Sequence, residues 1–88
     1  MNRTEIITRA DGPVTAELAP GVTVRVMATG SMGAVGVTTS LATFAASAEL
    51  PYHQHSFSEV IVVVSGEALV LVEGRRYVLH PFDAIHIP

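Results

Sequence analysis

Two histidines and one glutamate stand close together in the stretch PYHQHSFSEVIVVVSG, residues 51–66. Side chains two positions apart on an extended strand point the same way, so His53 and His55 would present both imidazoles to one side, with Cα atoms roughly 6.5–7 Å apart. Such rings can converge on one metal ion, and Glu59 could add an oxygen ligand after a short turn-like segment. Two histidines and one carboxylate leave coordination positions open for water, dioxygen or a chelating substrate.

Spacing alone leaves a second interpretation of these residues open. A histidine pair of this kind also occurs at the exposed edge of a strand, and a single glutamate nearby is common. The choice between a metal site and a solvated edge therefore depends on the elements that would position the three side chains.

The chain has 88 residues, which is enough for one small domain over residues 1–88. A chain of this size buries only about 60–65% of the surface that its unfolded form exposes, so we expect a partner subunit, most simply in a homodimer, or a bound ion to add stability. The composition is 49% apolar and 15% charged. That balance is typical of a folded globular chain and excludes a disordered segment.

The charged residues number eight acids against five arginines, with no lysine, for a formal charge of −3. A chain without a basic field attracts neither nucleic acid nor an anionic membrane, so neither is an expected partner. The chain has no cysteine, so nitrogen and oxygen atoms must hold any metal. The longest apolar run, Val60–Val64, is too short to span a bilayer, and the charged N-terminus does not resemble a secretory leader. A soluble, cytoplasmic protein is the default expectation.

Turn-forming residues recur every 8 to 12 positions, a rhythm that predicts an all-β fold. Alternation of valines with polar residues over 22–26 predicts a strand with one buried face. The runs Glu67–Glu73 and Arg75–Leu79 predict two strands joined by a tight turn at Glu73-Gly74, and Val60–Val64 is predicted to be a core strand. Many short strands without a long helix indicate a sandwich or a barrel.

One segment carries a conflicting pattern. Apolar residues in SLATFAASAEL, residues 40–50, recur at helical spacing, with Ser40 as a possible cap and Pro51 as a stop. The surrounding β pattern favours a strand over Val37–Phe44 followed by a loop. The glycine-rich GSMGAVG, residues 30–36, fits no phosphate-binding motif and is interpreted as a flexible connection.

The stretch with the two histidines resembles the first signature of the cupins, which reads H-x-H, three or four residues, E, six residues, G. Four residues match this pattern position by position, namely His53, His55, Glu59 and Gly66. The segment VEGRRYVLHPFDAIHIP resembles the approach to the second cupin signature, through Leu79, Pro81, Asp83 and Pro88. The resemblance covers roughly residues 37–88, and residues 1–36 match only as N-terminal strands and a connection. It implies a cupin-type antiparallel β-barrel, also described as a double-stranded β-helix or jelly roll.

Two departures from the cupin pattern stand out. Phe82 occupies a position where the family usually has glycine, which a bulkier residue can fill only if the turn does not need a positive φ. The chain also ends at Pro88, before the last ligand histidine of the second signature. The barrel would then be incomplete or completed by a partner chain, and the favoured interpretation is a fragment of a longer protein. His86 alternates with Ile85 and Ile87, so it is expected to point away from the barrel interior, and His80 lies in a turn.

The resemblance implies one divalent transition metal, Fe, Mn, Ni or Zn, held by His53, His55 and Glu59. The function that follows is a mononuclear metal-dependent enzyme of dioxygenase, decarboxylase, isomerase or lyase type, with a small oxygen-rich metabolite as its substrate. The alternative is a binding or sensing domain that holds a small-molecule ligand without turning it over. Tyr52, Phe57 and Tyr77 are candidate substrate-binding residues, although packed aromatics are the simpler interpretation. The pair Arg75-Arg76 is interpreted as a solvated hairpin tip that could meet an acidic ligand.

Overall fold

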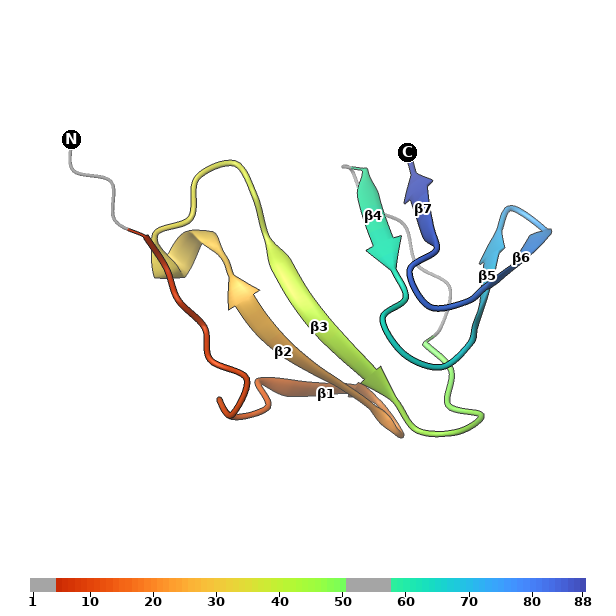
Figure 1. The fold of residues 1–88 in the computed structure, drawn as a ribbon, viewed down its shortest axis with the longest axis horizontal. Helices are drawn as coiled ribbons and strands as arrows, with labels where there is room; N and C mark the ends of the chain where they lie inside the picture. Colours follow the sequence, from red (N-terminus) through yellow and green to blue (C-terminus); the bar gives the residue numbers. More distant parts are fainter. Residues whose placement is uncertain (1–4, 51–57) are drawn as a thin grey trace. The chain divides into compact units, whose positions relative to one another are not determined.

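The computed structural model describes residues 5–50 and 58–88, which form antiparallel strands with no α-helix (Figure 1). The elements in chain order are β1 (Ala16–Ala19), β2 (Val22–Ala28), the 3-10 turn η1 (Gly30–Met32), β3 (Thr39–Phe44), β4 (Glu59–Val62), β5 (Ala68–Val72), β6 (Arg75–Leu79) and β7 (Ala84–Ile87). The predicted all-β class is confirmed. Across the described ranges, no helix has the length and apolar character that crossing a membrane requires. The chain divides into two compact units, residues 1–52 and 53–88.

The first unit holds one antiparallel sheet in the order β1-β2-β3. Strand β3 covers most of the predicted strand Val37–Phe44 and pairs along β2 from Val22–Phe44 to Ala28–Thr39. The helical spacing of residues 40–50 is therefore overridden, because β2 supplies β3 with a hydrogen-bonding partner along its length. The glycine-rich connection between β2 and β3 contains η1.

The expected single buried face of β2 is only partly present. Val22 is fully buried, but the other six residues of the strand are all half-buried. The segment before β1 explains the difference, because it lies against β2: Arg25 Nη1 donates to the carbonyl of Gly12 at 3.3 Å, and Val26 N donates to Thr15 Oγ1 at 3.0 Å. These contacts shelter the polar positions that alternation alone would leave in solvent.

The second unit consists of two antiparallel pairs, β4 with β7 and β5 with β6. The predicted hairpin is confirmed, since β5 and β6 pair from Ala68–Leu79 to Val72–Arg75 around Glu73 and Gly74. Both turn residues have positive φ, 48° and 81°. Two positive φ values in a two-residue loop are the geometry whose twist matches that of the flanking strands.

Strand β4 differs from the predicted core strand Val60–Val64. The strand ends at Val62, and Val60, Val62 and Val64 are 64%, 51% and 58% exposed. Ile61 is half-buried and Val63 is buried, so the segment alternates. The prediction was wrong for the exposed valines because, within residues 58–88, no other strand covers the face of the β4–β7 pair that carries them.

The turn from β6 to β7 is a type II turn over His80–Asp83. Asp83 N donates to the carbonyl of His80 at 2.9 Å, Pro81 occupies the second position, and Phe82 in the third position has φ 72°. Glycine is the usual residue there because the conformation requires a positive φ. The turn therefore does need a positive φ at position 82, where cupins usually have glycine. Phe82 adopts this conformation with 82% of its surface exposed.

Candidate functional site

Glu59 is the described member of the predicted metal-ligand set. It is the first residue of β4, lies opposite Ile87 of β7, and is half-buried. Residues directly opposite in an antiparallel pair share a face, so Glu59 lies on the half-buried face with Ile61, Ile85 and Ile87. Strand alternation therefore directs this carboxylate to the covered side of the β4–β7 pair.

The other two predicted ligands, His53 and His55, lie outside the described residues, as do Tyr52 and Phe57. Within residues 5–50 and 58–88, no three His, Cys, Asp or Glu side chains are grouped so that they could hold a metal ion. The predicted metal site and its three ligands stay a prediction.

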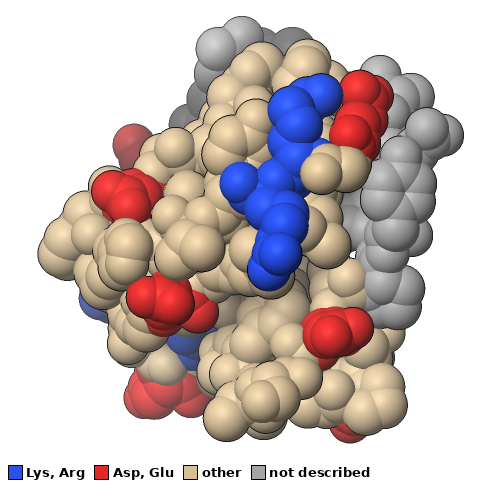
Figure 2. Space-filling view, turned by 90° about the vertical axis from the view of Figure 1, so that its right-hand side faces the viewer, with Lys and Arg blue, Asp and Glu red and all other residues tan. Residues whose placement is uncertain are grey.

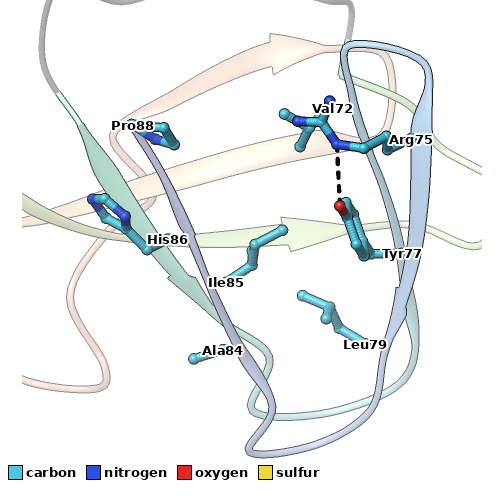
Figure 3. Close-up of a pocket in the computed structure, with 8 residues that line it drawn as sticks. All are labelled: Val72, Arg75, Tyr77, Leu79, Ala84, Ile85, His86 and Pro88. Carbon is cyan, nitrogen blue, oxygen red and sulfur yellow. Dashed lines mark hydrogen bonds between the residues drawn. The ribbon is translucent and has the colours of Figure 1, made fainter.

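A hollow of about 300 Å³ lies between β7 and the β5–β6 hairpin (Figure 3). Its apolar wall comes from both sides, and the residues that form it are Val72, Leu79, Ala84, Ile85 and Pro88, with His86 as a further lining residue on β7. Ile85 and Leu79 point toward each other across it (Figure 3). Ile85 shares its face with Glu59, whereas Ala84 and His86 line the hollow from the other face of β7, so the hollow lies along this strand rather than on one face of the β4–β7 pair.

Tyr77 and Arg75 bring polar atoms to this apolar hollow. Arg75 Nε donates a hydrogen bond to Tyr77 Oη at 3.2 Å, and both side chains line the hollow (Figure 3). The sequence named Tyr77 as a candidate substrate-binding residue, which stays a prediction, and it interpreted Arg75 as part of a solvated tip that could meet an acidic ligand; the Arg75 side chain is indeed 58% exposed, although it also lines the hollow. The signal that could have found Arg75 is its spacing, because residues two apart on a strand share a face.

His86 and His80 were weighed as replacements for the missing family histidine. His86 is exposed on β7, opposite Val60, and its ring points away from Ile85 (Figure 3). His80 lies in the turn after β6, where its Nε2 is 3.1 Å from Glu67 Oε2 and its Nδ1 is 3.6 Å from Asp83 Oδ2. The orientation that alternation predicts for His86 is therefore present, and His80 makes polar contacts between the two turns that flank the β5–β6 hairpin.

The second unit consists, in its described residues, of short antiparallel strands beside a hollow. This architecture is typical of small β-barrel and jelly-roll domains. The family model described as "Cupin domain" matches residues 40–88, more than half of the chain. The chain therefore belongs to the cupin family. No curated protein and no solved structure matches it. Family membership supports a small-molecule-binding domain, and cupin domains commonly bind a divalent metal.

Proposed function

We propose that this cupin holds one divalent transition metal through His53, His55 and Glu59 and acts on a small oxygen-rich metabolite. The observation that supports the proposal most directly is the position of Glu59. Glu59 lies on the half-buried face that also carries Ile85, one of the residues that line the hollow, and it stands at the place in the signature where the family pattern has a ligand. A strand that carried Glu59 on its exposed face would have argued against the site.

The donor set suits such a metal by its chemistry. Imidazole nitrogen and carboxylate oxygen bind Fe, Mn, Ni and Zn, and the chain offers no thiolate as a competing donor. A bound metal would act as a Lewis acid that polarises substrate oxygens. The chain's own contribution is the apolar wall of Val72, Leu79 and Ile85, against which the apolar part of a ligand would pack.

A binding or sensing domain is the second candidate function. The hollow favours it in one respect, because Arg75 and Tyr77, two of the polar residues that line it, are suited to bind and orient a ligand by hydrogen bonding. Titration of a ligand into metal-loaded and metal-stripped protein distinguishes the two functions. A sensor binds equally well without metal, whereas the enzyme needs the metal for turnover.

Elemental analysis of the purified protein tests the metal proposal. We expect about one equivalent of Fe, Mn, Ni or Zn per chain in the wild type and little metal in the double variant His53→Ala, His55→Ala, because two of the proposed ligands are removed. The matched control is His80→Ala, His86→Ala, which also removes two histidines but leaves the proposed ligands, and it should keep the wild-type content. Equal metal in the wild type and the His53/His55 variant would refute the site.

A further inference from the structure

The guanidinium of Arg75 offers more hydrogen-bond donors than its described contacts use. Of the five N–H donors of an arginine, the one on Nε is donated to Tyr77 Oη. Nη1 lies 3.8 Å from Glu73 Oε2, which is too long for a hydrogen bond. Within residues 58–88 the terminal amines therefore remain available for a planar, two-oxygen acceptor.

Tyr77 complements the arginine. Its hydroxyl oxygen accepts from Arg75 Nε, so its own proton is available for donation to a further acceptor. Figure 3 shows the hydroxyl and the guanidinium together at one end of the hollow, with Ile85 and Leu79 below them. The hollow is thus polar at one end and apolar along its length.

Arg75 and Glu73 bring one positive and one negative charge to this end, and their side chains are 58% and 76% exposed. Arg75 and Arg76 are the basic residues of the sequence from 53 to 88. In Figure 2, viewed from the side of the β5–β6 hairpin, basic side chains gather in one stripe. Only Arg75 turns toward the hollow, because Arg76 pairs with Leu71 on the other face of the hairpin. Glu73 is 76% exposed and at 3.8 Å, so solvent weakens its attraction to the guanidinium.

We infer that Arg75 and Tyr77 form an anion-binding head for this hollow and that its ligand is a small monocarboxylic acid with an apolar body. A guanidinium binds a carboxylate through two parallel N–H···O bonds, and one positive charge balances one negative charge. A phosphate carries close to two charges, which a single arginine beside Glu73 does not balance. The apolar body would pack against Leu79 and Ile85.

The inference rests on the proposed function in one respect, because both take this hollow as the site where a ligand binds. It does not require a bound metal. The test is titration of the purified protein with sodium benzoate, in which binding is measured by calorimetry and by the NMR signal of the Arg75 side-chain N–H. Benzamide, which has the same shape without charge, and inorganic phosphate are the comparison probes.

We expect benzoate to bind more tightly than benzamide or phosphate and Arg75→Gln to weaken benzoate binding about tenfold, since charge-assisted hydrogen bonds are lost. Arg76→Gln is the matched control, with the same charge change on the opposite face, and it should leave the affinity within about twofold. Tyr77→Phe should weaken binding a few-fold. Glu73→Gln should tighten it slightly, because an internal competitor is removed.

Equal losses in Arg75→Gln and Arg76→Gln, equal affinity for benzamide, or no saturable benzoate binding would overturn the inference. The His53→Ala, His55→Ala variant separates it from the metal proposal. Benzoate binding that survives in that variant supports the arginine head whether or not the wild type holds metal. Benzoate binding that is lost there but kept in Arg75→Gln would place the carboxylate on a metal and refute the head.

Discussion

Phe82 combines a positive φ of 72° with an almost fully exposed side chain, so the residue contributes little burial to offset its backbone conformation. A left-handed conformation costs a residue with a Cβ roughly 1–2 kcal/mol. The turn nevertheless forms, because Phe82 N donates to the carbonyl of Val63 at 2.6 Å and Val63 N donates to that of Asp83 at 3.1 Å. Long-range hydrogen bonds therefore hold a local conformation that the residue type disfavours.

Phe82→Gly is predicted to stabilise the protein by about 0.5–1 kcal/mol. Glycine adopts a positive φ without the roughly 1–2 kcal/mol of strain that a residue with a Cβ carries. This gain exceeds the roughly 0.4–1 kcal/mol by which the higher conformational entropy of glycine stabilises the unfolded chain. The measurement is the free energy of unfolding in denaturant. Phe82→Ala is the control, since it removes the phenyl ring but keeps the Cβ, and it should gain nothing. Equal stabilisation by alanine and glycine would show that the ring, not the backbone, is the source of strain.

Glu59→Gln tests the carboxylate of the proposed metal set without a change in side-chain shape. Substitution of residues that only hydrogen-bond to metal ligands typically lowers metal affinity tenfold to a hundredfold. Loss of a residue that binds the metal directly should lower it further, so the purified variant should carry far less metal than the wild type. Glu67→Gln, a change of the same kind at an exposed position beside His80, is the control and should keep its metal. Metal content unchanged by Glu59→Gln would remove Glu59 from the ligand set.

At the scale of elements, local signals predicted the strands that are paired through short turns. Arg75–Leu79 was predicted with its observed bounds, because Glu73-Gly74 is a strong turn signal and both residues adopt positive φ. The β4 segment was predicted less well. A run of β-branched residues indicates a strand, but it carries no information on whether one face or two will be covered, and Val60 and Val62 are exposed.

The candidate site was predictable to the same extent. Glu59 could be singled out because the cupin signature fixes its spacing from the two histidines, and its role as a ligand stays a prediction. The hydrogen bond between Arg75 and Tyr77 could not be predicted from the basic pair, because two arginines after a turn are usually solvated. The hollow itself depends on how the β5–β6 hairpin meets β7, which no local pattern contains.

The two hairpin glycines provide an element-scale prediction. Gly21, between β1 and β2, has φ 76°, and a Cβ there would lie 3.0 Å from Ala48 Cβ and 3.2 Å from Ala45 Cβ. Gly74 has φ 81° but no atom within 4 Å of such a Cβ. Both alanine substitutions should cost roughly 1–2 kcal/mol in backbone strain, and Gly21→Ala should cost about 1–3 kcal/mol more through overpacking. Denaturant unfolding compares them, and equal costs would contradict the crowding at Gly21.

At the scale of the whole molecule, the described residues bury few apolar side chains. Val22, Val63 and Leu79 are the buried apolar residues of the described ranges, while many large apolar side chains are over half exposed. On the β5–β6 hairpin, Leu69, Leu71 and Val78 share the outer face and are 51%, 58% and 53% exposed, and Arg76 lies at the end of this face opposite Leu71. An apolar face of this kind is unusual on a monomer and favours association.

We therefore expect the protein to be a homodimer that buries this outer face. Leu69→Glu should dissociate the dimer, because position 69 lies opposite Val78 and the substitution would place a charge within the apolar part of the interface. Val35→Glu is the matched control, since Val35 is 77% exposed in the connection before β3. Analytical ultracentrifugation should give twice the chain mass for the wild type and Val35→Glu, and the chain mass for Leu69→Glu. A monomeric wild type, or a dimer that survives Leu69→Glu, would refute this interface.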